Sequence, residues 1–67
     1  MDVDSALAQA RESVVLDALQ DGPLSLPELL AGAGMPGAIT YETLLRLEAR
    51  KKIDGILEGR THRFQLR

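Results

Sequence analysis

Apolar residues recur at helical spacing over the first third of the chain. From about residue 4 to residue 20 the polar positions fall on one side of a helix, which leaves a broad apolar side opposite them. The polar positions are Gln9, Ser13, Asp17 and Gln20, and the apolar ones are Leu7, Ala10, Val14, Val15, Ala18 and Leu19. Asp4 or Ser5 supplies an N-cap, and Gly22 followed by Pro23 stops the helix. So wide an apolar side predicts more than one neighbour, either the rest of the domain or a second subunit.

A capping box marks the start of a second, short helix. In Ser25-Leu26-Pro27-Glu28 the serine oxygen can accept from first-turn amides, while the glutamate reaches back to the serine amide. This predicts a helix at about 26–33, ended by the glycines that follow. A third helix is expected at about 36–51, because a proline is well suited to its first position. Its buried side is expected to carry Thr40, Leu44 and Leu47.

The last part of the chain predicts a β-hairpin at about 53–66. Two segments flank Glu58-Gly59-Arg60, a short loop with a glycine in place. In the second segment His62, Phe64 and Leu66 face one way, and the apolar pair makes this the core side, where His62 is expected to be a structural residue. Leu24, which lies between two turn signals, is expected to form a minimal edge strand.

These elements predict a mainly α fold with a small β-hairpin, in the order helix, minimal strand, two helices and two strands. We expect residues 1–67 to form a single domain. A domain of this length is only marginally stable alone. The sequence has no cysteine and one histidine, which excludes disulfide and zinc staples. A partner surface is the remaining support.

Composition narrows the class of protein. The chain is 45% hydrophobic and 27% charged, with a mean hydropathy of −0.06, which is too apolar for a disordered tail. No apolar run approaches the roughly 18 residues of a membrane span, and the acidic start, Met-Asp-Val-Asp, does not resemble a signal peptide. We therefore expect a soluble, cytoplasmic protein that is not an enzyme and binds neither a metal nor a small-molecule cofactor.

The net charge of −2 conceals an asymmetry between the two parts of the chain. Residues 1–45 carry seven acids and one base, a net charge of −6, whereas residues 46–67 carry seven bases and three acids, a net charge of +4. Such an asymmetry indicates an electrostatic docking face.

Several runs of the sequence form a recognisable pattern: Ser25-Leu26-Pro27-Glu28-Leu29-Leu30, Ala33-Gly34-Met35-Pro36, Tyr41, Leu44, Leu47-Glu48-Ala49-Arg50 and Ile53. With these runs the chain resembles winged helix-turn-helix transcriptional regulators of the MarR, PadR, ArsR and TrmB kinds, and it is also similar to the C-terminal winged helix of DprA-type DNA-processing proteins. The resemblance extends over residues 15–66. It implies three helices, a two- or three-stranded wing, and binding of double-stranded DNA by the third helix and the wing. Such regulators usually have glycine where this chain has Lys51.

The resemblance places candidate DNA contacts on the third helix and on the wing. They are Thr40, Tyr41, Arg46, Arg50, Lys51 and Lys52, followed by Arg60, Thr61 and Arg63. Phosphate contacts set affinity and register, whereas base contacts set specificity. The start of the third helix holds Gly37, Ala38, Ile39 and Glu42, where such regulators usually offer polar residues. We therefore expect backbone binding to exceed base reading.

Other interpretations of these residues remain open. Arg50, Lys51 and Lys52 also suit the negative C-terminal end of a helix, and Arg46 can pair with Glu42 four residues before it. The run from Gly32 to Gly37 matches a dinucleotide fingerprint, but a helix precedes it and no parallel sheet follows, so it indicates a turn. An alternative function is protein docking or homodimerisation. The candidate interface residues are Leu7, Val14, Ile39 and Leu45.

Overall fold

The structure is a computed structural model that describes residues 3–67. It begins with helix α1 (Val3–Ala18), which runs directly into a single 3-10 turn, η1 (Leu19–Asp21). The Gly22 N–H donates to the Leu19 carbonyl at 3.2 Å, which tightens this last turn. The expected helix at about 4–20 is thus an α-helix that ends at residue 18, followed by a tighter turn.

Helix α2 (Leu26–Ala33) begins at the predicted capping box. The Ser25 N–H donates to the Glu28 carboxylate at 2.9 Å, and the Glu28 N–H donates to the Ser25 hydroxyl oxygen at 3.4 Å. Both bonds satisfy amides that a helix start otherwise leaves without a partner. At the other end, Gly34 has a φ of +67°, the left-handed conformation that commonly ends a helix.

Helix α3 (Gly37–Ala49) ends two residues before the expected position. The Lys51 N–H donates to the Glu48 carbonyl at 3.0 Å, and the Lys52 N–H donates to the Leu47 carbonyl at 2.9 Å. This pair of bonds is a Schellman motif, which requires a left-handed residue just after the helix. Lys51 takes that conformation with a φ of +60°. The prediction of helix to residue 51 was wrong because a lysine gives no sign of this ending.

Replacing Lys51 with glycine is expected to raise the free energy of unfolding by about 0.5–1 kcal/mol. A side chain in the left-handed region costs about 1–2 kcal/mol, part of which glycine loses again through its freer unfolded state. Denaturant unfolding monitored by circular dichroism measures the change. Lys52→Gly, at a position without positive φ, is the matched control and is expected to give no gain. An equal effect of the two substitutions would contradict the interpretation that the left-handed backbone at Lys51 is strained.

A small antiparallel sheet completes the fold. Its strands are β1 (Leu24–Ser25), β2 (Ile53–Glu58) and β3 (Thr61–Leu66), in the order β1-β3-β2. Glu58 pairs with Thr61, so two residues form the hairpin loop instead of the expected three. The first of them, Gly59, has a φ of +60°, as favoured two-residue hairpin loops require.

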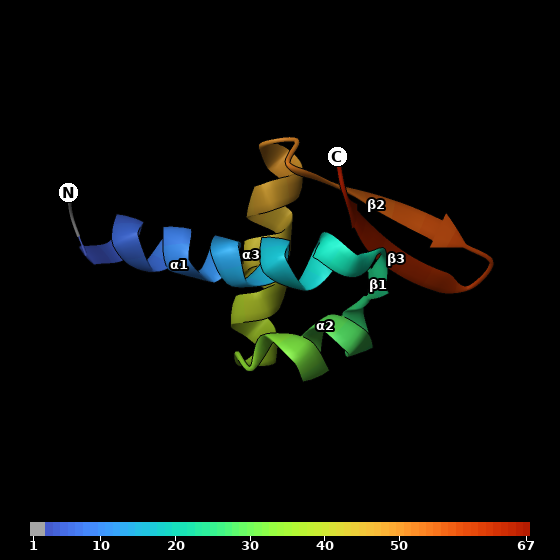
Figure 1. Ribbon diagram of the computed structural model, residues 1–67, viewed down its shortest axis with the longest axis horizontal. Coiled ribbons are helices and arrows are strands. Elements are labelled where there is room, and N and C mark those ends of the chain that lie inside the picture. Colours follow the sequence, from blue (N-terminus) through green and yellow to red (C-terminus); the bar gives the residue numbers. More distant parts are fainter. Residues whose placement is uncertain (1–2) are drawn as a thin grey trace.

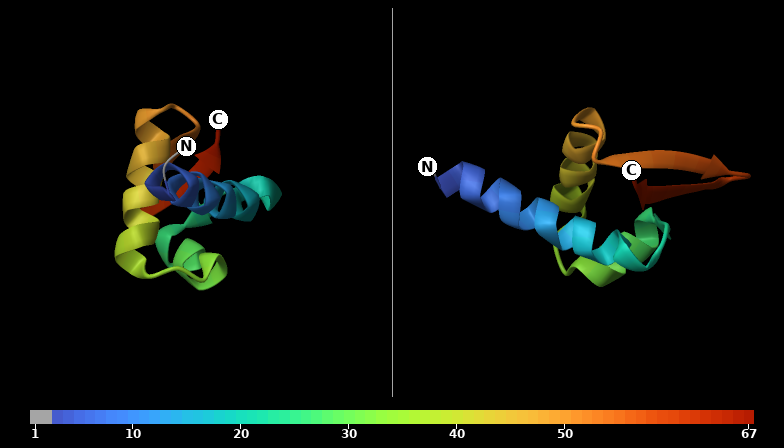
Figure 2. Two further views of the ribbon diagram at one scale, coloured as in Figure 1. Left: turned by 90° about the vertical axis from the view of Figure 1, so that its left-hand side faces the viewer. Right: turned by 45° about the horizontal axis from the view of Figure 1, so that its top comes forward.

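The core lies where the three helices meet the sheet. Its buried side chains are Val15, Leu19, Leu29, Leu44, Leu47, Ile53 and Phe64. Helix α1 crosses α3, and its N-terminal part extends beyond α3 on the side away from the β2–β3 hairpin (Figures 1 and 2). The molecule is consequently elongated, at 41 × 23 × 20 Å. Three helices and a three-stranded sheet confirm the predicted fold class.

Candidate nucleic-acid interface

Helix α3 turns one face into the core and leaves the other to solvent. Thr40, Thr43, Leu44 and Leu47 are its buried residues. Thr40 is fully buried, and its hydroxyl donates to the Pro36 carbonyl at 3.2 Å. Because the side chain is buried and its hydroxyl is already satisfied, its proposed contact with DNA is corrected to a structural role.

The exposed face of α3 carries the other candidates of this helix. Tyr41 and Leu45 are each about half exposed, with 50% and 49% of their surface accessible. Arg46 is also exposed and pairs with Glu42 at 3.2 Å, as the four-residue spacing allowed. Ile39, the other apolar candidate of this helix, is half-buried.

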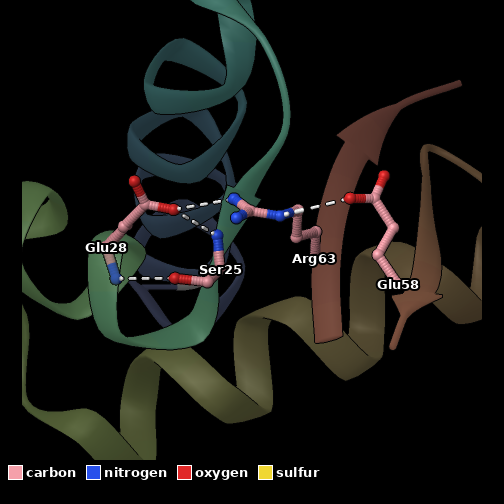
Figure 3. Close-up of polar contacts among 4 residues, drawn as sticks. All are labelled: Ser25, Glu28, Glu58 and Arg63. Carbon is pink, nitrogen blue, oxygen red and sulfur yellow. Dashed lines mark hydrogen bonds and ion pairs between the residues drawn. The ribbon is translucent and has the colours of Figure 1, made fainter. Parts of the chain in front are cut away.

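Arg63, on β3, lies between two carboxylates and forms an ion pair with each of them (Figure 3). Its Nη1 lies 3.2 Å from Glu28 Oε1 and its Nε lies 3.6 Å from Glu58 Oε2. The Ser25 backbone N–H, the Ser25 hydroxyl and the Arg63 charge hold the pKa of the Glu28 carboxyl below its ordinary value. The carboxylate is therefore charged at neutral pH and keeps Arg63 attached to the start of α2.

Arg50 has a structural partner as well. Its Nη1 lies 2.5 Å from Oε1 of Glu12, on α1, although the two residues are 38 positions apart. The Glu12 side chain is 9% exposed, and the Arg50 side chain is 55% exposed. The pair joins the C-terminal end of α3 to the middle of α1. This pair could not be predicted from the sequence, because its two members are 38 positions apart.

Four of the seven basic residues in 46–67 form ion pairs with acidic side chains. These four are Arg46, Arg50, Arg63 and Arg67, of which the last pairs with Asp54 at 3.8 Å. The other three, Lys51, Lys52 and Arg60, are exposed and form no ion pair within residues 3–67. Thr61, beside Arg60, is also exposed. The free cations therefore gather at the end of α3 and at the tip of the hairpin, rather than over the whole C-terminal part.

Strand β2 separates these two groups of cations. Lys52 directly precedes the strand and Arg60 lies in the loop after it. Six residues of strand span about 20 Å. The two groups would therefore meet different phosphates of a nucleic acid.

Arg11, the one base of residues 1–45, was not among the predicted contacts. A shallow hollow between α1 and α3 brings Arg11 together with Arg46. Its remaining lining residues are Asp4, Ser5, Leu7 and Ala8. Arg11 forms no ion pair within the described residues and adds a positive charge beside the exposed face of α3. The sequence did offer one sign of this role: Arg11 falls within the otherwise apolar side of the first helix, four residues after Leu7 and three before Val14.

Helix α1 leaves a row of apolar side chains uncovered. Val3, Leu7, Ala10 and Val14 are all exposed, and their spacings of four, three and four residues match the seam of a coiled coil. Of the apolar positions of this helix, only Val15 is buried. We call the four exposed residues the α1 seam. Leu7 and Val14, predicted as interface residues, both belong to it.

His62 lies on the same face of β3 as Phe64 and packs against it, as its core-side position predicted. It is nevertheless exposed, because its place on β3 is near the hairpin tip. Its ring packs against Phe64, with ring centroids 4.6 Å apart. A Cβ on Gly55 would come within 2.6 Å of His62 Nε2, so the glycine is what lets the imidazole lie across β2.

Within residues 3–67, no group of three or more His, Cys, Asp or Glu side chains is arranged to hold a metal ion. No helix in the same range combines the length and the apolar character needed to cross a membrane.

Solved structures share this architecture. BpsR of Bordetella bronchiseptica, whose DNA binding is regulated by 6-hydroxynicotinic acid, is 32% identical, with a TM-score of 0.84 over 97% of this chain and 48% of its own. A homodimeric winged helix-turn-helix DNA-binding domain from Mycobacterium bovis, of a possible ArsR-family transcriptional regulator, is 23% identical, with a TM-score of 0.79 over 96% of this chain and 59% of its own. HlyU of Vibrio cholerae is 19% identical, with a TM-score of 0.66 over 98% and 80%.

The chain thus spans about half the length of the first two of these proteins. No protein-family model matches it, and no curated protein matches it. The agreement extends over almost all of its residues, including the hairpin that forms the wing. The chain has the winged helix-turn-helix fold, and the resemblance found in its sequence is confirmed.

Proposed function

We propose that this chain binds double-stranded DNA through α3 and the wing, as the DNA-binding part of a transcriptional regulator. The observation that carries the proposal is the agreement with BpsR, 32% identical over 97% of this chain, because BpsR is itself a DNA-binding protein. In folds of this kind, the second helix of the helix-turn-helix enters the major groove. Here that helix is α3, and its exposed face includes Tyr41 and Arg46.

Most of the affinity is expected to come from phosphate contacts. Lys51, Lys52 and Arg60 are exposed and unpaired within the described residues, so they can meet phosphates without first breaking an ion pair. Arg63 would have to leave Glu28 before it could do the same. We therefore place Arg63 second to the free cations as a DNA contact. Arg50 supports the fold rather than the contact.

Replacing a free cation is expected to weaken binding to every duplex alike and to lower its salt dependence. Each phosphate neutralised contributes a slope of about −0.9 to the plot of log affinity against log salt. Lys52→Ala and Arg60→Ala are each expected to reduce the steepness of that slope by about 1. Fluorescence anisotropy of a labelled 20-base-pair duplex, titrated at several salt concentrations from about 50 mM upwards, measures the slope.

Arg67→Ala is the matched control, because it removes a cation that already pairs with Asp54 near the end of the wing. It is expected to change the slope by less than either test variant. Absence of duplex binding at about 50 mM salt and micromolar protein would contradict the proposed function. Equal slopes for all three variants would contradict the assignment of the phosphate contacts.

The α1 seam favours a second activity, self-association. We infer that α1 of one copy packs on α1 of another, since an exposed apolar row at coiled-coil spacing is completed by an equivalent row. The M. bovis winged helix domain, of the same fold, is homodimeric. Dimers of helix-turn-helix proteins bind two half-sites related by the symmetry of the protein. DNA binding and self-association are therefore compatible in one regulator.

A further inference from the structure

The exposed face of α3 is unusually apolar for a surface that is to meet bases. Gly37, Tyr41 and Leu45 follow one another at intervals of four residues and form one row along the helix. The Leu30 side chain of α2 extends this row, since its Cδ2 lies 3.6 Å from the place of a Cβ on Gly37. Leu30 and the two large α3 side chains are all exposed. We call Leu30, Gly37, Tyr41 and Leu45 the α3 row.

The polar side chains beside the α3 row already pair with each other. Arg46 and Glu42 lie on the adjacent line of α3 and pair with each other at 3.2 Å. Ala38, which precedes them on that line, offers no hydrogen-bonding group. The Tyr41 hydroxyl is the remaining polar atom of the row. The face therefore presents chiefly apolar contact area, with few donors or acceptors for base edges.

The major groove contains one apolar group that such a face can recognise. Each base pair presents hydrogen-bonding atoms there, but only thymine adds a C5-methyl group, and apolar side chains contact it. We propose that the α3 row reads thymine methyls, with Tyr41 and Leu45 as the specificity-determining residues. This inference rests on the proposed function, and it assigns thymine-containing duplex as the class of DNA preferred.

The charges around the α3 row favour DNA over a protein as its occupant. Lys51 and Lys52 follow the C-terminal end of α3 as free cations, and Arg11 adds another beside Arg46. A rim of cations suits the phosphates on either side of a groove. At the other end, Gly37 and Ala38 allow the helix to approach closely. The self-association that we infer uses a separate surface, the α1 seam.

The experiment compares duplexes that differ only in C5-methyl groups. The first pair is a 20-base-pair dA·dT duplex and the same duplex with uracil in place of thymine. The second pair is a dG·dC duplex and its 5-methylcytosine counterpart, which places a methyl group at the equivalent position of the pyrimidine ring. Removing the methyls is expected to weaken binding about fourfold for each methyl in contact, and adding them to cytosine to strengthen it. The salt slope is expected to stay the same, because the phosphates do not change.

Leu45→Ala is expected to reduce the thymine-to-uracil ratio towards 1 while the salt slope is unchanged. Leu57→Ala is the control, since Leu57 is an exposed leucine on the wing strand β2, away from α3. Circular dichroism shows whether each variant is folded, and both positions are exposed enough to tolerate the change.

Equal binding of both members of each pair by the unaltered protein overturns methyl reading but leaves the proposed function standing. Absence of binding to all four duplexes overturns both. If Leu45→Ala instead disrupts self-association, the α3 row is a protein contact and the inference fails.

Discussion

Replacing Arg50 with alanine is expected to lower the free energy of unfolding by about 2 kcal/mol. The substitution leaves the Glu12 carboxylate, whose side chain is 9% exposed, without its partner on α3. Removing one member of a buried ion pair costs about 3–5 kcal/mol, and an exposed pair is worth about 0–1 kcal/mol. Arg50 is about half exposed, so an intermediate loss is expected. Urea unfolding monitored by circular dichroism gives the value.

A double-mutant cycle with Glu12→Gln separates the pair from the other effects of each residue. The double variant is expected to lose less than the sum of the single losses, because removing Glu12 takes away the buried charge. Arg67→Ala, which breaks the exposed pair with Asp54, is expected to change stability by no more than about 1 kcal/mol. If Arg50→Ala instead leaves stability unchanged and weakens DNA binding as Lys52→Ala does, Arg50 is a phosphate contact and its structural role is wrong.

Replacing Val14 with aspartate is expected to weaken self-association at least 100-fold. The charge would enter the C-terminal end of the α1 seam, where a second copy of the helix would deprive it of water. Val14 is 38% exposed in the single chain, so the substitution does not place a charge in the core. Sedimentation velocity over a range of protein concentrations measures the change, and circular dichroism checks that α1 remains helical.

Leu57→Asp is the control for this substitution, because Leu57 is an apolar residue of the wing with 73% of its surface exposed. It is expected to leave self-association intact. A monomer at about 100 µM for the unaltered chain would remove the α1 seam as a self-association surface. Loss of association with both aspartate variants would place the contact elsewhere. In either case the DNA-binding proposal stands on its own test.

Local chemistry explains which parts of the fold the sequence could predict. The capping box at Ser25 and Glu28 specified the start of α2, because all its bonds join residues three positions apart. The alternation around Phe64 predicted the face of β3 that enters the core, since strand geometry is local too. The end of α3 was missed because its Schellman motif depends on a left-handed Lys51, and lysine has no preference for that conformation.

The site was less predictable because it depends on contacts between distant residues. Arg50 and Arg63 look alike in a list of bases, yet one pairs with Glu12 and the other with Glu28, 38 and 35 positions away. Similarly, the apolar side of the first helix was visible in the sequence. Which part of it would be covered was not, because that depends on where α1 crosses α3 (Figure 1).

The attachment of the wing has a consequence for the shape of any duplex it meets. β1 pairs with β3, with Ser25 opposite Arg63, and the Arg63–Glu28 ion pair joins the same strand to α2. Hydrogen bonds and an ion pair thus fasten the hairpin to the body at its middle strand, so the distance from α3 to the hairpin tip is set by the protein. A duplex that touches both has to match that distance, and one whose relaxed shape does not match it has to bend or change the width of its groove. Flexible steps such as TA and CA deform at the lowest energy. Positions that the protein never contacts would then contribute to its choice of DNA.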